Sequence, residues 1–238
     1  MSARIRFMAI KPQRAHRRTE ALSRDVIVEA ATEILDAEGE DALTLRALTV
    51  RLTTGYGAIY HHVADRDELL AAAADRVIAR IVADLAADAE PGQALRAVAL
   101  GLFDAIDAHP WLGTQLALQM SRSPWQSATP QILERIGRQV RALGVPEGSQ
   151  FTTIFALVYY ILGAAGQNAV NRASAGMLRP GVARNEYLDA VVTQWEALDP
   201  EEYPFIRAAA GQLREHDDRS EFLAGVDVIL AGITSVYL

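Results

Sequence analysis

The apolar residues near the N-terminus recur at the three- and four-residue spacing of amphipathic helices, which predicts a series of short helices. The apolar face of the first helix consists of Ile27, Ala30, Ala31, Ile34 and Leu35. Gly39 follows this face and is typical of a helix end, because glycine readily adopts the backbone conformations found there.

Two more helices are predicted after Gly39, separated by a polar turn. The apolar stripe of the first of them consists of Leu45, Leu48 and Leu52. The hydroxyl of Thr44 is placed to cap its first turn. Thr53-Thr54-Gly55 then interrupts the pattern, and Ile59 and Val63 are expected to point inward from the helix that follows. Three short helices of this kind are typical of a helix-turn-helix DNA reader, although similar corners also serve plain packing in helical proteins.

The rest of the chain is also helical by pattern, without the alternation that strands show. A helix from near Arg66 is expected to run to about Ala89, where Pro91-Gly92 would stop it. Further helices are predicted at about 93–108, 111–120, 130–143, 149–174, 185–198, 201–215 and 218–236. The sequence therefore predicts an all-α protein with a basic arm (1–22), a helix-turn-helix domain (23–70) and a larger C-terminal helical domain (71–238).

The net charge of −7 is unevenly distributed along the 238 residues. Residues 1–24 carry seven Lys or Arg and one Glu, whereas residues 25–43 carry seven acids and no base. This distribution leaves one basic region on an acidic protein, which favours nucleic-acid binding by that region. The basic arm is expected either to add phosphate or minor-groove contacts or to be a solvated leader.

Compartment and membrane association follow from other features of the composition. Cysteine is absent, which excludes disulfides and thiol chemistry and is compatible with a reducing cytosol. The N-terminus lacks the apolar segment of a signal peptide, so a cytoplasmic location is expected. An uncharged stretch runs from Gly148 to Asn171, but its apolar part is shorter than the ~20 residues of a membrane span. This stretch is expected to be a core or subunit-interface helix.

The first third of the chain contains a specific set of residues. It consists of Ala30-Ala31, Ile34-Leu35, Gly39, Thr44-Leu45-Arg46-Ala47-Leu48, Gly57-Ala58-Ile59-Tyr60-His61-His62-Val63 and Arg66-Asp67-Glu68-Leu69-Leu70. With this set the chain resembles the TetR (tetracycline-repressor-like) family of bacterial transcriptional regulators. The resemblance implies a dimeric, ligand-responsive repressor that binds a palindromic operator in double-stranded DNA.

The resemblance also implies roles for individual residues. The positions of Tyr60 and Arg66 are expected to contact phosphates and that of Arg46 a base, as the donors of these side chains allow. Tyr56 is expected to contact a base or sugar from a helix start that orders on DNA; the alternative is that its flanking glycines relieve crowding. The expected DNA-binding residues are Thr44, Arg46, Gly55, Tyr56, Gly57, Ala58, Tyr60, His61, His62 and Arg66.

Two positions depart from the family pattern in the second helix and the turn after it. The family turn usually carries Gly where this chain has Thr53, and a small residue where it has Thr49.

In the C-terminal part, the resemblance implies a four-helix dimer interface and a ligand cavity. The expected interface residues are Phe151, Tyr160, Phe222, Val226, Ile229, Leu230 and Ile233; the alternative is that both helices are ordinary core of one protomer. The expected ligand-binding residues are His109, Trp111, Gln115, Met120, Trp125, Phe155, Tyr159, Gln167, Asn168 and Asn171. They combine an apolar wall with few polar groups, which is typical of a site for an organic molecule.

A metal or catalytic site is not expected. His109 matches by eye a histidine that helps to hold a metal–drug chelate in the tetracycline-binding members, but Gln167 stands where those members have an acid. The histidines show no HExxH spacing, His61 and His62 are expected to diverge on a helix, and nucleophile-elbow and phosphate-loop motifs are absent. The predicted function is a repressor released by an organic inducer, without cofactor; a helical small-molecule-binding protein or a partner-controlled regulator are the alternatives.

Overall fold

The computed structural model describes residues 22–84, 89–125, 128–178 and 184–237, and these residues contain no strand. Most of the predicted basic arm therefore lies outside the described residues. The helices are α1 (Arg24–Glu38), the short 3-10 helix η1 (Glu40–Ala42), α2 (Leu45–Leu52), α3 (Tyr56–Tyr60), α4 (Arg66–Asp84), α5 (Pro91–Ala108), α6 (Trp111–Arg122), α7 (Ala128–Ala142), α8 (Glu147–Leu178), α9 (Arg184–Glu196), α10 (Pro204–Leu213) and α11 (Asp218–Tyr237). The prediction of an all-α fold is confirmed.

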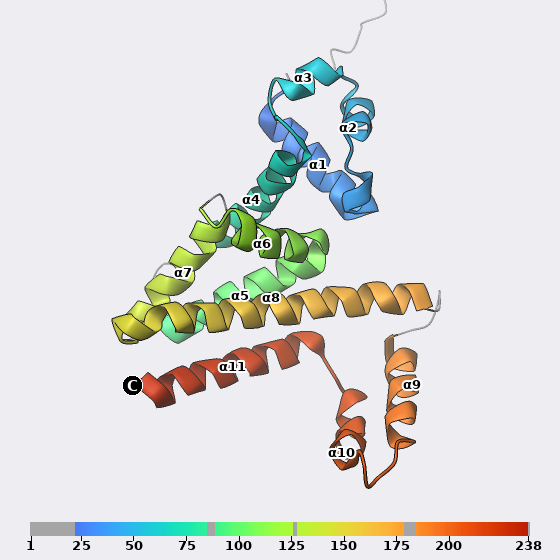
Figure 1. Cartoon of the computed structure of the whole chain (residues 1–238), viewed down its shortest axis with the longest axis vertical. Coiled ribbons are helices and arrows are strands. Elements are labelled where there is room, and N and C mark those ends of the chain that lie inside the picture. Colours follow the sequence, from blue (N-terminus) through green and yellow to red (C-terminus); the bar gives the residue numbers. More distant parts are fainter. Residues whose placement is uncertain (1–21, 85–88, 126–127, 179–183, 238) are drawn as a thin grey trace, which may run out of the picture.

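The helices form a small domain at one end of the molecule and a larger one below it (Figure 1). Helices α1 to α3 surround the first turns of α4, which then descends into the larger domain. There α5, α6 and α7 lie between α4 and the long helix α8, and α11 packs along α8 on the far side. Helices α9 and α10 pair with each other as a hairpin at the other end of the molecule.

The apolar patterns of the first two helices end in the core. All five residues of the predicted α1 face are 5% exposed or less. Leu48 is fully buried, whereas Leu45 and Leu52 lie half-buried at the edge of the same cluster. Ile59 and Val63 are buried as predicted, although Val63 lies beyond the end of α3.

Pro91-Gly92 begins a helix rather than ending one. Pro91 occupies the first turn of α5, where its missing N–H would have had no helical acceptor. The Glu90 carboxylate caps this turn by accepting a hydrogen bond from the Gln93 N–H at 3.0 Å. Helix α4 is described to Asp84, and its predicted end near Ala89 falls after residues that the structure does not describe.

Three of the five α11 residues predicted for the dimer interface are buried inside the protomer, which corrects the prediction for these three. Phe222, Val226 and Ile233 are buried against the chain's own helices. The Tyr160 hydroxyl of α8 donates to the Phe222 carbonyl at 3.0 Å, and the two rings stack. Ile229 and Leu230 are partly buried in the same cluster.

The outward faces of α8 and α11 remain apolar. Phe151 is 71% exposed on α8, and Val228 and Val236 are 73% and 69% exposed on α11. By length and composition alone, Glu147–Arg172 and Asp218–Tyr237 would be able to cross a membrane, a property they share with the core helices of soluble proteins. Because each of these helices packs on its own chain along one side, its other side is left as an apolar surface.

Candidate nucleic-acid interface

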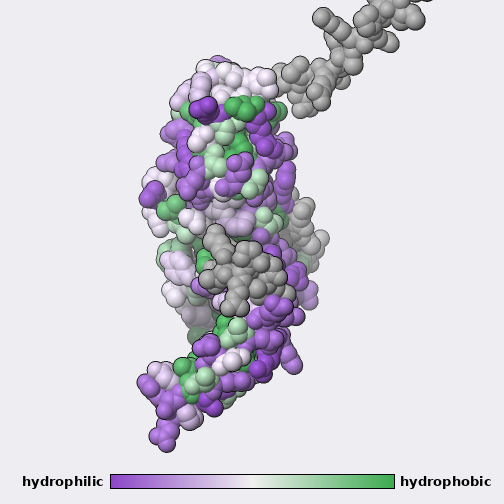
Figure 2. Space-filling model, turned by 90° about the vertical axis from the view of Figure 1, so that its right-hand side faces the viewer, coloured by the Kyte–Doolittle hydropathy of each residue, from purple (hydrophilic) through white to green (hydrophobic). Residues whose placement is uncertain are grey.

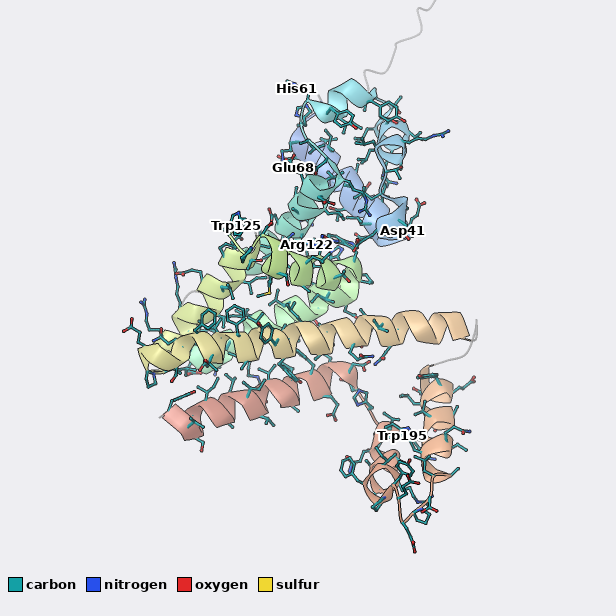
Figure 3. The ribbon with its side chains drawn as sticks, viewed as in Figure 1. Asp41, His61, Glu68, Arg122, Trp125 and Trp195 are labelled. Atoms are coloured by element: carbon teal, nitrogen blue, oxygen red, sulfur yellow. The ribbon has the colours of Figure 1, made fainter. Side chains whose placement is uncertain are left out.

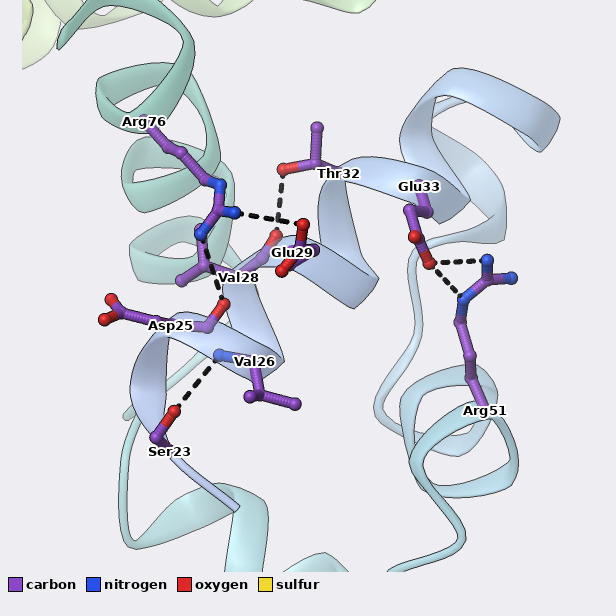
Figure 4. Close-up of polar contacts among 9 residues, drawn as sticks. All are labelled: Ser23, Asp25, Val26, Val28, Glu29, Thr32, Glu33, Arg51 and Arg76. Carbon is purple, nitrogen blue, oxygen red and sulfur yellow. Dashed lines mark hydrogen bonds and ion pairs between the residues drawn. The ribbon is translucent and has the colours of Figure 1, made fainter. Parts of the chain in front are cut away.

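Helix α1 is the scaffold on which the small domain is assembled (Figure 4). The Ser23 hydroxyl caps it by accepting from the Val26 N–H at 3.3 Å. The Arg51 guanidinium of α2 contacts Glu33 through two N–H groups at 2.9 and 2.6 Å. Arg76 of α4 pairs with Glu29 at 3.1 Å. Helices α2 and α4 are thus both held to α1 by arginine–carboxylate pairs.

Helix α2 presents its N-terminal end to solvent. Thr44 caps it as predicted, since its hydroxyl accepts from the Ala47 N–H at 3.1 Å. The Arg46 side chain is exposed beside this cap, and the Thr49 hydroxyl donates to the Arg46 carbonyl at 2.8 Å. Arg46 therefore has the freedom that contact with a base or phosphate requires.

The turn between α2 and α3 depends on an unusual backbone conformation at Thr53. With φ of 50° and ψ of 51°, Thr53 is the one non-glycine residue with positive φ among those described. Its N–H completes the end of α2 by donating to main-chain carbonyls there. This is the position where the resembled family usually has Gly, and glycine takes this conformation without the steric cost of a Cβ.

Helix α3 is a single short turn with one buried and two exposed large side chains. Ile59 is fully buried and anchors the helix, whereas Tyr56 and Tyr60 are 51% and 52% exposed. Gly55 is the N-cap, so of the two glycines only Gly57 lies within the helix. A Cβ at either glycine would meet nothing within 4 Å, so relief of crowding within the protomer does not explain them.

The two histidines after α3 do not diverge on a helix as predicted, because the helix ends at Tyr60. The rings of His61 and His62 instead contact each other edge to face, with centroids 5.2 Å apart. Figure 3 shows His61 at the outer tip of the small domain. Among the described residues, no group of three or more potential metal ligands occurs.

Arg66, predicted to contact phosphate, is engaged within the domain. Its Nε donates to the Leu43 carbonyl at 3.2 Å and its Nη2 to the Glu40 carbonyl at 2.6 Å. These bonds hold the segment between α1 and α2 to the start of α4. A guanidinium has five N–H groups, so this bracing leaves donors for a further partner.

The start of α4 is stabilised by reciprocal capping. Asp65 accepts from the Glu68 N–H at 2.8 Å, and Glu68 accepts from the Ala64 N–H at 2.7 Å and pairs with Arg24 at 3.1 Å. The main-chain N–H of Ala64 and then the Arg24 guanidinium lower the pKa of Glu68. The acidic residues in the resembled motif therefore have a local structural role.

Sequence reasoning missed Val50, which is 74% exposed on α2. It lies outside the stripe of Leu45, Leu48 and Leu52, and an aliphatic side chain off the buried face was the available signal. Such a side chain offers apolar contact to a thymine methyl group. Together, Arg46, Val50 and Tyr56 give this end of the domain charged, apolar and aromatic contacts.

Comparison with known proteins agrees with this geometry. A model of the bacterial regulatory proteins of the tetR family matches residues 27–73. The transcriptional regulator SCO7222, a TetR from Streptomyces coelicolor, is 55% identical; the match covers 92% of this chain and all of that one, with a TM-score of 0.83.

The chain belongs to the TetR family. Two further relatives are a transcriptional repressor and another TetR-family protein. The HTH-type transcriptional repressor DrrR1 of Streptomyces coeruleorubidus is 29% identical over 94% of this chain and 80% of its own length. The TetR-family protein ActR of Streptomyces coelicolor, solved in complex with actinorhodin, is 25% identical over 92% of this chain and 98% of its own, with a TM-score of 0.75.

In this TetR-family chain, two predicted ligand residues instead join the two domains. The Asp36 carboxylate of α1 lies 2.6 Å from His109 Nδ1 and accepts from Trp111 Nε1 at 2.7 Å. Trp111 is 5% exposed, and His109 caps the C-terminus of α5. Helix α1 is thereby fixed to the junction of α5 and α6.

The remaining predicted ligand residues do not converge on one cavity in this conformation. Gln115 is buried on α6, and Trp125 is 72% exposed (Figure 3). Asn168 is buried and donates to Asp107 at 2.9 Å. Gln167 and Asn171 are exposed and hydrogen-bond to each other at 2.9 Å.

Two of the predicted ligand aromatics lie on the outer face of α8. The Phe155 ring packs at a tilt between those of Phe151 and Tyr159, with ring centroids 4.5 and 5.4 Å away. Tyr159 is 65% exposed. The helix-period spacing of these residues does not reveal which side of α8 they occupy.

Met120 does line an internal cavity of the larger domain. This cavity lies among α5 to α8 and has a volume of only about 10 Å³, about enough for one water molecule. A drug-sized ligand requires several hundred cubic ångströms, so binding between these helices requires them to separate.

Proposed function

We propose that this TetR-family regulator is a cytoplasmic repressor that binds a palindromic operator as a homodimer and is released by a small organic inducer. The observation that best supports this proposal is the outward surface of α2 and α3. There Arg46, Tyr56 and Tyr60 are exposed around a helix start that no other part of the described chain covers.

Each of these side chains suits one kind of DNA contact. The exposed Tyr60 hydroxyl is a donor for phosphate, and the Arg46 guanidinium pairs with phosphate or with a guanine edge. The open space at Gly55 and Gly57 allows the sugar–phosphate backbone to approach the N-terminus of α3 closely. Tyr56 then reaches a base or sugar at the groove edge.

A homodimer is supported by the apolar surfaces of α8 and α11. Phe151 and Tyr159 on α8, with the half-buried Phe155 between them, and Val228 and Val236 on α11 leave apolar side chains exposed on two neighbouring helices. Pairing these helices with their copies would bury this surface. It would also present two helix-turn-helix domains, here called reading heads (α1 to α3), on one side of DNA. A twofold arrangement with heads about 34–36 Å apart matches a palindromic site.

Release by an organic molecule is supported by the ligand complexes of the relative ActR. In this chain, separation of α5 to α8 around a ligand would move the α5–α6 junction and, through Asp36, helix α1. A ligand that prefers the separated conformation then lowers operator affinity by its difference in affinity for the two conformations.

The test is fluorescence anisotropy with labelled DNA from upstream of the chain's own gene, measured for the parent and for Tyr56→Ala and Tyr60→Phe. Loss of one charge-assisted phosphate contact is expected to weaken binding by Tyr60→Phe about tenfold. Arg138→Ala, an exposed arginine of α7 in the other domain, serves as the matched control and should leave affinity unchanged. Unchanged affinity in both tyrosine variants would overturn the proposed reading surface.

A further inference from the structure

A cavity lies at the joint between the two domains, separate from the space between α5 and α8 where the family's ligand is expected. It has a volume of about 670 Å³. One wall comes from the small domain and the first turns of α4, and includes Glu40 of η1 and Asp67 of α4. The other wall comes from α6 and includes Gln115 and Arg122. Figure 3 shows two of the lining residues, Glu68 on α4 and Arg122 on α6. A molecule of several hundred daltons fits a cavity of this size.

Gln119 gives this cavity an unsatisfied polar group. Its side chain lines the cavity and is 8% exposed, yet neither its amide nitrogen nor its amide oxygen has a hydrogen-bond partner. Buried amides are nearly always hydrogen-bonded, because leaving both groups unmet costs the full desolvation of each. Gln115, one turn earlier and 7% exposed, lies on the same wall. This arrangement suits a ligand that offers both a donor and an acceptor.

The charge of the lining favours a cation. The ionisable groups around the cavity are the acids Glu40, Asp65, Asp67, Glu68 and Asp75 and the arginines Arg24, Arg66 and Arg122. Arg24 is paired with Glu68, and Arg66 keeps its positive charge while it donates to main-chain carbonyls, so the five acids and three arginines give the lining a net charge of −2. The Asp65 carboxylate accepts from the Glu68 N–H in the first turn of α4, which places a negative charge at this helix end.

Asp75 supports the same conclusion. Burial raises its pKa, whereas the main-chain N–H of Ala128 and the positive charge of Arg24 act in the opposite direction. A further cation in the cavity would favour the charged carboxylate in the same way as Arg24 does.

We propose that the interdomain cavity is an effector site for a small organic amine that also carries hydroxyl or carbonyl groups. The ammonium group lies against the carboxylates of α4, and a hydroxyl or carbonyl group pairs with the Gln119 amide. Because the two walls belong to different domains, occupancy changes the position of the reading domain relative to the larger one. This regulatory role rests on the proposed function, whereas binding of the amine does not.

Binding is tested by calorimetric titration of the full chain with kanamycin and with spermidine, using sucrose and citrate as neutral and anionic comparisons. Kanamycin is expected to bind, and Gln119→Leu, which keeps the size of the side chain, is expected to weaken it about tenfold. Met120→Leu is the control, since Met120 faces the internal cavity on the other side of α6. Equal binding by Gln119→Leu, preference for citrate, or absence of saturable binding by both amines overturns the proposal.

Regulation is tested without relying on any ligand, because the chain has no cysteine. Ser123→Cys, at the cavity, is labelled with a methanethiosulfonate that adds a trimethylammonium group, and Ser220→Cys on the surface of α11 receives the same label. Labelled Ser123→Cys should lose operator affinity about tenfold relative to its unlabelled form, and labelled Ser220→Cys should not. If unlabelled protein binds no operator, the proposed function fails; if it binds and the Ser123 label has no effect, the effector role fails.

Discussion

Gly225 of α11 occupies a position where a single added methyl group should destabilise the protein. A Cβ there would lie 3.0 Å from Tyr160 Cε2 and closer still to Cζ and the hydroxyl. The Tyr160 ring cannot yield easily, because it stacks on Phe222 with centroids 5.6 Å apart and its hydroxyl donates to the Phe222 carbonyl. Gly225→Ala must therefore displace a ring that joins α8 to α11.

The expected loss follows from these contacts. Overpacking costs about 1–3 kcal/mol, and the displaced ring loses a hydrogen bond of about 1 kcal/mol. Alanine recovers up to about 1 kcal/mol over glycine inside a helix. The net fall in unfolding free energy for Gly225→Ala should be about 2 kcal/mol. Adding Tyr160→Phe to the Gly225→Ala protein should recover only part of the lost unfolding free energy, because the Cζ atom still overlaps the new methyl group.

Gly232, two turns later on the same helix, supplies the control. A Cβ at Gly232 meets nothing within 4 Å, so Gly232→Ala should raise the unfolding free energy of a protomer by up to about 1 kcal/mol. Urea unfolding followed by circular dichroism at one fixed protein concentration measures both variants. A Gly225→Ala protein as stable as Gly232→Ala would refute the packing of Tyr160 described above.

Four further variants test other parts of the structure. Thr53→Gly should raise the unfolding free energy by about 1 kcal/mol, because it removes a Cβ from a left-handed conformation. A lower unfolding free energy in urea would contradict this. Asp36→Ala should lower it by about 1–3 kcal/mol, since it leaves the Trp111 N–H buried without its acceptor, and should do less in a Trp111→Phe background. Asp75→Asn should stabilise the protein at neutral pH, because it replaces a buried, ionised carboxylate by a neutral amide. This gain in unfolding free energy should vanish as the pH falls below the raised pKa of Asp75, where the parent side chain is neutral too. Val228→Arg should shift the protein towards monomer in analytical ultracentrifugation, and an unchanged sedimentation profile would remove α11 from the proposed dimer interface.

The small domain was predictable because its helices are short and amphipathic. In such a helix the apolar stripe is narrow, so Ile27, Leu48 and Ile59 had only one side to bury. The predicted Thr44 cap was equally local, since its hydroxyl bonds an N–H three residues away, and the Asp65 cap, which was not predicted, has the same spacing. The buried faces of these short helices could therefore be predicted from the sequence of each helix alone.

The larger domain was less predictable because its helices are apolar on more than one side. For α11, the stripe that includes Phe222 and Val226 was a plausible subunit interface, but it packs on the protomer's own α5 and α8. The opposite side, which includes Val228, is the one left exposed. The periodicity gives two candidate faces, and only the positions of the other helices decide between them. The same ambiguity put Tyr159 into a predicted cavity, whereas it lies on the surface.

The hairpin of α9 and α10 shows the same limit on a smaller scale. Its apolar side chains include Phe205, which is 77% exposed, and Trp195, which lies between the two helices (Figure 3). Figure 2 shows hydrophobic and hydrophilic residues intermixed at this end of the molecule. A short helix pair that packs mainly on itself does not have enough interior surface to bury all of its apolar residues.

The contacts at the domain joint explain how distant events would reach the reading head. Helix α1 meets the larger domain through Asp36, whose one carboxylate oxygen binds both His109 and Trp111. Arg66, at the start of α4, ties that helix to the segment before α2. Together with the Arg24–Glu68 and Arg76–Glu29 pairs, these contacts fix the reading head to the α5–α6 junction and to α4. A movement of α6 relative to α4 must rotate the head or break one of these contacts, and the interdomain cavity lies between the same two helices. Under the proposed function, a ligand bound in this cavity would act on the reading head through these contacts.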